Sequence, residues 1–290
     1  MTLEPTIKQI KDNVWKVEEA GTKYSLKQYR SMSTAVKVKY VHEELEKMSF
    51  PHIVPLLPTE DQLLLKQPWL ENARPVSYKR RADRTDSLMA LRELHRTDRH
   101  FNWKASPYLH TYPLMMKWTD RLSRFLDHRA FFQQLIGVRR VQEIIFYAKE
   151  ALPIVKQHAN EAIGQHTLLH GDVVHHNILR DENGVIRLID FDLACTSHPD
   201  TELALWSHRV LPHVSYNVDF LFEEQQALDK MNRNAKAMLL YPNEILREWL
   251  HLLTLPEHNQ HKLARQLIPF TEAALFAWPK LWFDVEKRMK

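Results

Sequence analysis

The sequence predicts an α+β fold in which a small, strand-rich amino-terminal lobe precedes a larger helical lobe. Three observations predict it. Residues 5–30 alternate apolar and polar side chains as strands do, apolar residues recur at helical spacing through most of the chain after residue 87, and a short β-rich segment interrupts that region at 167–191. A chain of 290 residues is long enough to bury a substantial hydrophobic core without disulfides or structural metals.

The amino-terminal lobe is expected to span residues 1–70, with a hinge near 67–70 that joins it to the rest of the chain. A turn at Glu19–Lys23 separates two alternating segments, and the apolar residues of the one helix fall on a single face. The predicted elements are three or four strands, among them 14–18, 24–29 and 63–67, and a helix over 34–48; the fourth strand would precede the turn at residues 11–13.

Residues 71–290 are expected to form the helical lobe around the β-rich loop at 168–192. Ser87 is the predicted N-cap of a helix over 88–95. Further helices are predicted over 114–128, 131–152 and 153–163, and after Pro199 the pattern predicts helices broken at Pro212, Pro242, Pro256, Pro269 and Pro279.

The composition excludes several classes of protein. The net charge is only +4 and no Lys/Arg block dominates, so we expect no nucleic-acid partner. No apolar run approaches the roughly 18–20 residues of a membrane helix, so we expect no membrane partner. The first residues lack the apolar core of a secretory signal, and the single cysteine, Cys195, suits a reducing compartment. We therefore expect a cytoplasmic protein.

Glycine is scarce in this chain. It has five glycines among 290 residues, whereas glycine usually makes up about 7% of a protein. The glycine-rich phosphate-binding loops of Rossmann and P-loop proteins therefore cannot be present in intact form.

Three residues of the β-rich segment carry the strongest chemical signal. Asn177 follows Asp172 by five residues, and an Asn-Gly turn between two short strands brings Asp190 back toward Asn177. One amide oxygen and one carboxylate suit Mg²⁺, which takes few ligands from protein and completes its shell with phosphate oxygens. Asp172 would accept the proton of an attacking hydroxyl, and His170 would brace the loop. The first spacing is that of the catalytic loop in phosphoryl-transfer enzymes.

The motif resembles that of the aminoglycoside phosphotransferase/choline kinase family, whose members share the protein-kinase-like fold. The family pattern of His-Gly-Asp, four residues and Asn, and then Ile-Asp-Phe, is matched by residues 170–177 and 189–191. Leu91–His95 resembles the family's helix that ends in Leu-His, and Pro68–Glu71 resembles its hinge. Residues 239–249 resemble the spore-coat-associated branch of endospore-forming bacteria, which adds spore association to the expected locations.

The resemblance implies a two-lobed fold that binds ATP, with GTP as the alternative nucleotide, together with Mg²⁺. It implies a strand lysine that binds the α- and β-phosphates, and Lys27 fits by position. Its glutamate partner would be Glu44, with Glu43 as the alternative. Adenine would lie against the hinge, at Gln67 and Trp69.

Two features depart from the family pattern. The turn between the first two strands, Lys11-Asp12-Asn13, contains no glycine, so its backbone amides would approach a phosphate less closely than glycine permits. Asp192 stands where protein kinases have the glycine of Asp-Phe-Gly, and it would face either a second metal ion or solvent.

We predict an ATP-dependent phosphotransferase that acts on a hydroxyl of a small-molecule substrate. The alternative is a structural protein of kinase fold with weak or no catalysis, such as a spore-coat-associated protein, which the glycine-free turn favours. A protein kinase is disfavoured because no Ala-Pro-Glu motif follows Asp190. The sequence does not indicate the acceptor or the oligomeric state.

Overall fold

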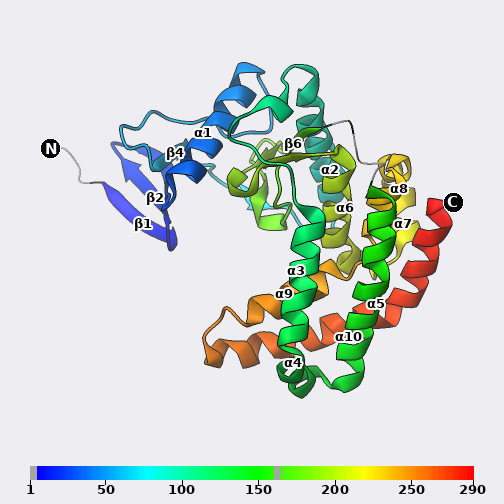
Figure 1. Ribbon diagram of the computed structural model, residues 1–290. Coiled ribbons are helices and arrows are strands. Elements are labelled where there is room, and N and C mark those ends of the chain that lie inside the picture. The colour runs from blue at the N-terminus through cyan, green and yellow to red at the C-terminus, as the bar shows by residue number, and fades with distance from the viewer. Residues whose placement is uncertain (1–4, 160–163, 165) are drawn as a thin grey trace. The chain divides into compact units, whose positions relative to one another are not determined.

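In the computed structural model, which describes residues 5–159, 164 and 166–290, the chain divides into two units (Figure 1). Unit 1 contains Met1–Tyr112 and His166–Pro199, and unit 2 contains Pro113–Gln165 and Asp200–Lys290. This division differs from the boundary at residue 70 that the sequence predicts, because the β-rich loop and the chain up to Tyr112 belong to the same unit as the amino-terminal sheet.

A four-stranded antiparallel sheet forms the amino-terminal part of unit 1, as the alternating pattern predicts (Figure 1). Its order is β1-β2-β3-β4, and Ser25 pairs with both Lys16 and Gln67, so β3 has a strand on each side. The strands are β1 (Thr6–Lys11), β2 (Val14–Glu19), β3 (Thr22–Gln28) and β4 (Leu64–Pro68).

Two helices accompany this sheet in unit 1. α1 (Met32–Lys47) is capped by Ser31, whose Oγ accepts a hydrogen bond from the Thr34 amide. α2 (Arg81–His95) begins earlier than expected, and the prediction that Ser87 caps it is wrong. Ser87 is fully buried inside the helix, where its hydroxyl donates to the Arg84 carbonyl oxygen instead of accepting from an amide.

Two small sheets hold the β-rich loop in place within unit 1. One has the order β5-β7-β8, and β7 and β8 form the predicted hairpin around the turn at Asp181–Gly184. The other pairs β6 with β9. The strands are β5 (Arg74–Pro75), β6 (Thr167–Leu169), β7 (Ile178–Arg180), β8 (Ile186–Leu188) and β9 (Cys195–Ser197).

Unit 2 is built of helices packed around buried aromatic side chains. Trp118 stacks on Tyr241 with ring centroids 4.4 Å apart, and Trp249 is fully buried. The helices are α3 (Leu114–Asp127), α4 (Arg129–Ile136), α5 (Val138–Gln157), α6 (Pro199–Val210), which begins at the last residue of unit 1, α7 (Val218–Glu224), α8 (Arg233–Met238), α9 (Asn243–Leu252) and α10 (Glu257–Met289).

Several helix boundaries in unit 2 differ from the predicted ones. The helix expected over 131–152 is divided at Gly137, whose φ of +87° lies in the left-handed region that glycine tolerates best. α5 then continues through Pro153, and residues 160–163 of the helix expected at 153–163 lie outside the described residues. α10 also runs through Pro269 and Pro279, so the breaks predicted there are wrong. Packing of a long apolar face outweighs the one hydrogen bond that each proline removes.

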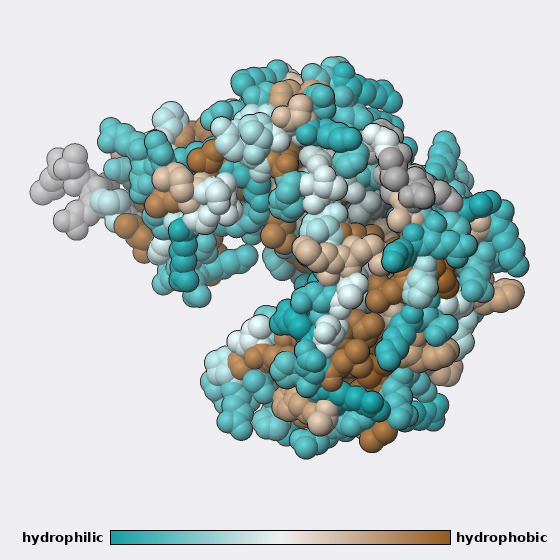
Figure 2. All heavy atoms as spheres, viewed as in Figure 1, coloured by the Kyte–Doolittle hydropathy of each residue, from teal (hydrophilic) through white to brown (hydrophobic). Residues whose placement is uncertain are grey.

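Hydrophilic residues cover most of the face of the molecule shown in Figure 2, with apolar residues gathered between helices of unit 2. Among the described residues, no helix combines the length and the apolar character needed to cross a bilayer.

Asp83 joins three separate segments of unit 1. Its carboxylate, 1% exposed, accepts hydrogen bonds from Arg74 at 2.8 Å, from Arg180 at 2.8 Å and from the Ser77 amide at 2.9 Å. Burial favours the neutral acid, but these donors together hold the pKa of Asp83 well below its usual range. The short β5–β7 pairing therefore depends on a charged group in α2.

Replacing this carboxylate should destabilise unit 1. We expect Asp83→Asn to lower the free energy of unfolding by about 3 kcal/mol, since it leaves two guanidinium groups without their buried partner. Urea denaturation measures the effect. Asp86→Asn is the control, because Asp86 also contacts Arg180 but is 41% exposed and should cost less than about 1 kcal/mol. The carboxyl of Asp83 binds its proton less tightly in the folded protein than in the unfolded chain. The free energy of unfolding should therefore decrease as the pH is lowered beneath about 4, and Asp83→Asn should make that decrease smaller. Equal losses in both variants would contradict this role.

Candidate functional site

Unit 1 encloses a cavity of about 310 Å³ between its four-stranded sheet and its β-rich loop. Most of its wall is apolar, and three of its polar residues, Lys27, Asn177 and Asp190, lie near one another at what is here called its polar side. This combination is typical of a small-molecule site. The apolar lining includes Val14, Val38, Val54, Leu65, Leu179 and Ile189.

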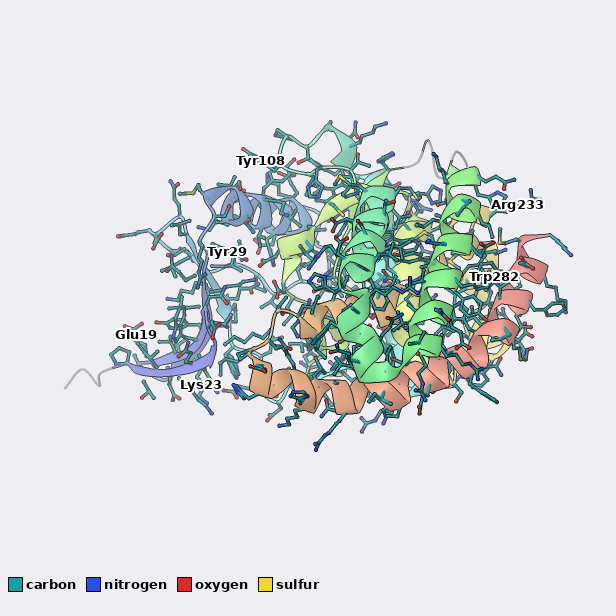
Figure 3. The ribbon with its side chains drawn as sticks, turned by 60° about the horizontal axis from the view of Figure 1, so that its bottom comes forward. Glu19, Lys23, Tyr29, Tyr108, Arg233 and Trp282 are labelled. Atoms are coloured by element: carbon teal, nitrogen blue, oxygen red, sulfur yellow. The ribbon has the colours of Figure 1, made fainter. Side chains whose placement is uncertain are left out.

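The alternation of β3 directs one face of the strand toward this cavity. Ser25 and Lys27 both line it, and Tyr29 follows two residues later on the same side. Figure 3 shows Tyr29 just beyond the end of the strand opposite to Lys23, which is partly exposed and pairs with Glu71. The strand therefore carries one lysine that lines the cavity and one that does not.

Lys27 binds two carboxylates at once. Its Nζ lies 2.6 Å from Asp190 Oδ1 and 2.6 Å from Asp192 Oδ2, and only 14% of its side chain is exposed. Burial opposes ionisation of Asp190, but the charge of Lys27 and its hydrogen bond hold the pKa of Asp190 below the usual value. The structure therefore keeps a lysine and an ionised carboxylate together at the polar side of the cavity.

Two further side chains hold Asp192. The Tyr29 hydroxyl donates to Asp192 Oδ1 at 2.8 Å, and Lys37 from α1 donates to the Asp192 carbonyl oxygen at 2.6 Å. Burial, and then the charge of Asp192, raise the pKa of Tyr29, so this hydroxyl stays protonated and donates. Asp192 therefore does not simply face solvent. It shares the Lys27 ammonium group with Asp190 and is held in place by Tyr29 and Lys37.

The loop that carries Asp172 is braced by His170. The Asp172 amide donates to His170 Nδ1 at 3.3 Å, so the proton of the ring lies on Nε2, which donates to the Ile189 carbonyl oxygen at 2.9 Å. His170 thereby ties the loop to the residue before Asp190, in the bracing position that the sequence predicts for it. Gly171 between them has a φ of +82°, and a Cβ there would lie 2.0 Å from the Leu193 carbonyl oxygen.

Asn177 is held so that its amide oxygen is directed away from Asp172. Its Nδ2 donates to the Asp172 carbonyl oxygen at 3.2 Å and to Asp172 Oδ2 at 3.1 Å. Since both donors of the amide are engaged with Asp172, Oδ1 remains to accept or to ligate. Asn177 lines the same cavity as Asp190, so the amide oxygen and the carboxylate form a donor set that suits Mg²⁺.

Asp190 itself adopts an unusual backbone conformation. Its φ of 68° and ψ of 60° are left-handed, a region that few non-glycine residues adopt and that aspartate and asparagine enter more often than most. Phe191 after it is fully buried and contacts the rings of His42 and His170, with centroids 5.4 and 4.6 Å apart. Burial lowers the pKa of His42 to about 4, so His42 is neutral in this apolar stack.

The predicted hinge residues lie at the cavity wall. Gln67 and Trp69 both line it. The Gln67 side-chain amide donates to the Val54 carbonyl oxygen at 2.8 Å, and the Trp69 amide donates to the Lys23 carbonyl oxygen at 3.0 Å. The Lys16 ammonium lies 4.6 Å from the Trp69 ring centroid. These contacts fix the strand end against which a flat ring could lie.

Glu44 is placed differently from the expectation. Its carboxylate accepts from Lys47, one turn further along α1, at 2.6 Å, whereas Lys27 pairs with Asp190 and Asp192. The predicted Lys27–Glu44 pair is therefore not the one the structure contains. The face of α1 that lines the cavity carries Val38 and His42. Spacing along the chain does not distinguish the two pairs, since Glu44 and Lys47 also suit an ordinary surface pair.

Lys11 is the cavity-lining side chain of the glycine-free turn. Asn13 holds this turn to β3, since its amide Nδ2 donates to the Gln28 carbonyl oxygen at 3.1 Å and its own carbonyl oxygen accepts from the Gln28 amide. His176 of the β-rich loop also lines the cavity. Burial, and then the charge of Lys11, lower the pKa of His176, so the two side chains are within electrostatic reach of each other.

Sequence reasoning missed Tyr29, Lys37 and His42 as parts of this site. Tyr29 could have been found from the strand period, because it stands two residues after Lys27. Lys37 and His42 carry no such signal. Only the packing of α1 beside residues 190–192 brings them in, and helical spacing alone does not say which polar residue of a helix faces a cavity.

The arrangement has the parts needed for phosphoryl transfer. It offers an apolar cavity for a flat ring, an ammonium group at the polar side, an oriented amide oxygen beside a carboxylate, and a second carboxylate on a braced loop. Electrostatic stabilisation and alignment are the main contributions that a protein makes to this reaction.

Comparisons with known proteins agree with this geometry. Residues 6–213 match the model of the phosphotransferase enzyme family, and no curated protein matches the sequence. The aminoglycoside phosphotransferase of Alicyclobacillus acidocaldarius subsp. acidocaldarius DSM 446 has a similar structure, with a TM-score of 0.72 at 16% identity over 99% of this chain and 93% of its own. The match and the fold confirm the predicted enzyme class and the kinase-like architecture.

Two other solved structures share the fold. Choline kinase LicA from Streptococcus pneumoniae gives a TM-score of 0.55 at 13% identity, over 92% of this chain and 94% of its own, and it has also been solved with AMP. A spectinomycin phosphotransferase in complex with ADP and spectinomycin gives a TM-score of 0.58 at 14% identity, over 96% of this chain and 94% of its own. The spore-coat branch, suggested by residues 239–249, stays a prediction.

Gly171 offers a direct test of how the loop is built. We expect Gly171→Ala to lower the free energy of unfolding by roughly 3 kcal/mol or more, because the new Cβ meets backbone and the conformation is left-handed. Gly184→Ala is the matched control: its φ is +80° and nothing lies within 4 Å of its Cβ, so it should cost only about 1–2 kcal/mol. Thermal denaturation of both variants measures the difference. Similar losses would mean that the close approach to Leu193 is not a constraint.

Proposed function

We propose that this chain, which belongs to the phosphotransferase enzyme family, transfers the γ-phosphoryl group of ATP to a hydroxyl of a small molecule. The observation that carries the proposal is the placement of Lys27, Asn177 and Asp190 at the polar side of one cavity, with Asp172 hydrogen-bonded to Asn177. The similar spectinomycin phosphotransferase, solved with ADP and spectinomycin, supports both the nucleotide and the small acceptor.

The nucleotide would occupy the cavity of unit 1. Adenine suits the apolar wall beside Gln67 and Trp69, and the phosphates suit the polar side, where Lys27 would bind them. An ammonium group makes charge-assisted bonds of the same kind to carboxylate and to phosphate, so Lys27 can exchange a carboxylate for phosphate oxygens. GTP is the alternative nucleotide, and a comparison of the two belongs in the first assay.

Asn177 and Asp190 would hold Mg²⁺, because an oriented amide oxygen and an ionised carboxylate are hard oxygen donors. When bound, the ion neutralises charge on the phosphate oxygens. Asp172 would orient the acceptor hydroxyl and take its proton. The acceptor oxygen forms a bond to the γ-phosphorus, the bond from that phosphorus to the β-γ bridging oxygen breaks, and ADP leaves with its electron pair.

The glycine-free turn favours a second candidate. Lys11-Asp12-Asn13 presents a lysine side chain where glycine would let backbone amides approach phosphate closely. A kinase-fold protein with weak or no catalysis, such as a spore-coat-associated one, would have the same scaffold. Binding of Mg·ATP or Mg·GTP separates the candidates, since at about 100 times its dissociation constant a ligand adds roughly 2.7 kcal/mol to stability.

Asp172→Ala should abolish most turnover without unfolding the protein. We expect kcat to fall by about 10²–10⁴-fold, the usual contribution of a positioned base, with the affinity for Mg·ATP nearly unchanged. Turnover is measured on an acceptor found with a hydroxyl-metabolite panel, and circular dichroism checks the fold. Near-parental kcat in this variant would remove Asp172 from the proposed role.

Lys27→Met should impair nucleotide use far more than Lys23→Met. Both lysines are in β3, but Lys23 does not line the cavity and its partly exposed side chain pairs with Glu71, so its loss should leave turnover within about twofold. Lys27→Met should lower kcat/KM for Mg·ATP by about 10²–10³-fold, since a charge that faces the phosphates is removed.

The same change has a structural cost that the control lacks. Lys27→Met leaves Asp190 and Asp192 without their shared cation, so we expect a loss of about 1–2 kcal/mol in unfolding free energy. Asp190→Asn in the same background should recover part of it. Equal loss of activity in Lys23→Met and Lys27→Met would show that only general electrostatics is at work.

A further inference from the structure

Unit 2 contains a hollow of its own, about 210 Å³ in volume, on the seam between α3 and α9, which pack side by side (Figure 1). Four of its six lining residues carry cationic or titratable nitrogen groups, and no carboxylate is among the described residues that line it. The lining residues are Arg121, Arg124, Arg247, Leu250, His251 and Thr254.

Helical spacing brings these basic residues together. Arg121 and Arg124 are three residues apart on α3, and Arg247 and His251 are four apart on α9, so each pair lies on one helix face. The two helices pack against each other, and each buries apolar residues, such as Trp118 on α3 and Leu246 on α9. The basic residues therefore flank a fixed helix–helix packing instead of a mobile loop.

The carboxylates near these arginines, Glu244 and Glu248, do not line the hollow. Glu244 accepts from Arg209 and also lies 3.2 Å from Arg247, which contacts Glu248 as well. Burial opposes ionisation of Glu244, but Arg209 and Arg247 outweigh it and hold its pKa below the usual value. One ionised carboxylate is thus shared by two guanidinium groups.

Two nitrogen groups of the hollow lack partners within the described part of the chain. The Arg124 side chain makes no hydrogen bond or ion pair, and Arg247 Nε is buried without an acceptor. Arg121 is anchored, because its Nη1 donates to Asn243 Oδ1. Three guanidinium groups around one hollow repel one another, and an anion bound among them would relieve that repulsion.

We propose that this hollow binds an oxyanion group, the phosphate or carboxylate of a small molecule. Guanidinium forks match both groups bidentately. The hollow is smaller than the roughly 300–1,000 Å³ of sites for drug-sized ligands, so it suits the charged group and a few more atoms. The inference rests on unit 2 alone and does not depend on the proposed phosphotransferase reaction.

Titration with inorganic phosphate, and separately with citrate, tests the proposal on the full chain at constant ionic strength. Calorimetry gives the dissociation constant, and the side-chain Nε resonance of Arg247 reports on the site itself. We expect saturable binding with a shift of that resonance. Phosphate binding alone would assign phosphorylated ligands, and citrate binding alone would assign carboxylates. Failure of both to bind at millimolar concentration would overturn the proposal.

Two variants locate the bound anion. Arg124→Gln should weaken binding at least tenfold, whereas Arg139→Gln should not change it, because Arg139 is an exposed arginine of α5 already paired with Glu143. Equal weakening in both would leave only general electrostatics and refute the site. Lys27→Met should bind phosphate as the parent does. If Lys27→Met loses it and Arg124→Gln keeps it, the anion occupies the cavity of unit 1, and the proposal fails while the phosphotransferase site stands.

Discussion

Lys27 between the carboxylates of Asp190 and Asp192 is the interaction on which the rest of the site depends. Two acidic side chains, each about one-third exposed, lie close together only because an ammonium group contacts both at 2.6 Å. Tyr29 and Lys37 add donors to Asp192, so the central strand of the sheet, the helix α1 and the segment after β8 meet at one cluster of charge. The cluster positions the groups that a metal–nucleotide complex would engage.

The structure around the site holds Gly171 and the Asp190–Phe191 segment in backbone conformations that most residues avoid. Asp190 is left-handed, Gly171 leaves no space for a side chain, and Phe191 is held between two histidine rings. Strain of this kind persists only where the neighbouring structure over-determines it, and it clusters at functional sites. His170 helps to hold this conformation, because hydrogen bonds at both of its ring nitrogens join the loop at Asp172 to Ile189. Catalysis by alignment requires such rigidity.

The sequence predicted the strands of the amino-terminal sheet, the hairpin at Asp181–Gly184 and the proximity of Asp190 to Asn177, because local turn chemistry and strand period decide these features. It did not predict the short strands β5 and β9. It failed where tertiary packing decides. Pro269 and Pro279 lie inside one helix, and Ser87 is buried within α2 instead of capping it. The sequence also did not predict the partner of Lys27. Whether Lys27 pairs with Glu44 or with Asp190 depends on the rotation of α1 about its axis, and spacing along the chain does not determine that rotation.

A crystal structure with Mg²⁺ and a non-hydrolysable ATP analogue tests directly whether Lys27, Asn177 and Asp190 bind a metal–nucleotide complex. We expect the nucleotide to lie in the cavity of unit 1, with Asn177 Oδ1 and Asp190 in contact with the metal. We also expect Lys27 Nζ to have exchanged at least one carboxylate for phosphate oxygens. A nucleotide bound elsewhere, or a nucleotide in the cavity whose phosphates contact neither Lys27 nor a metal held by Asn177 and Asp190, would contradict it.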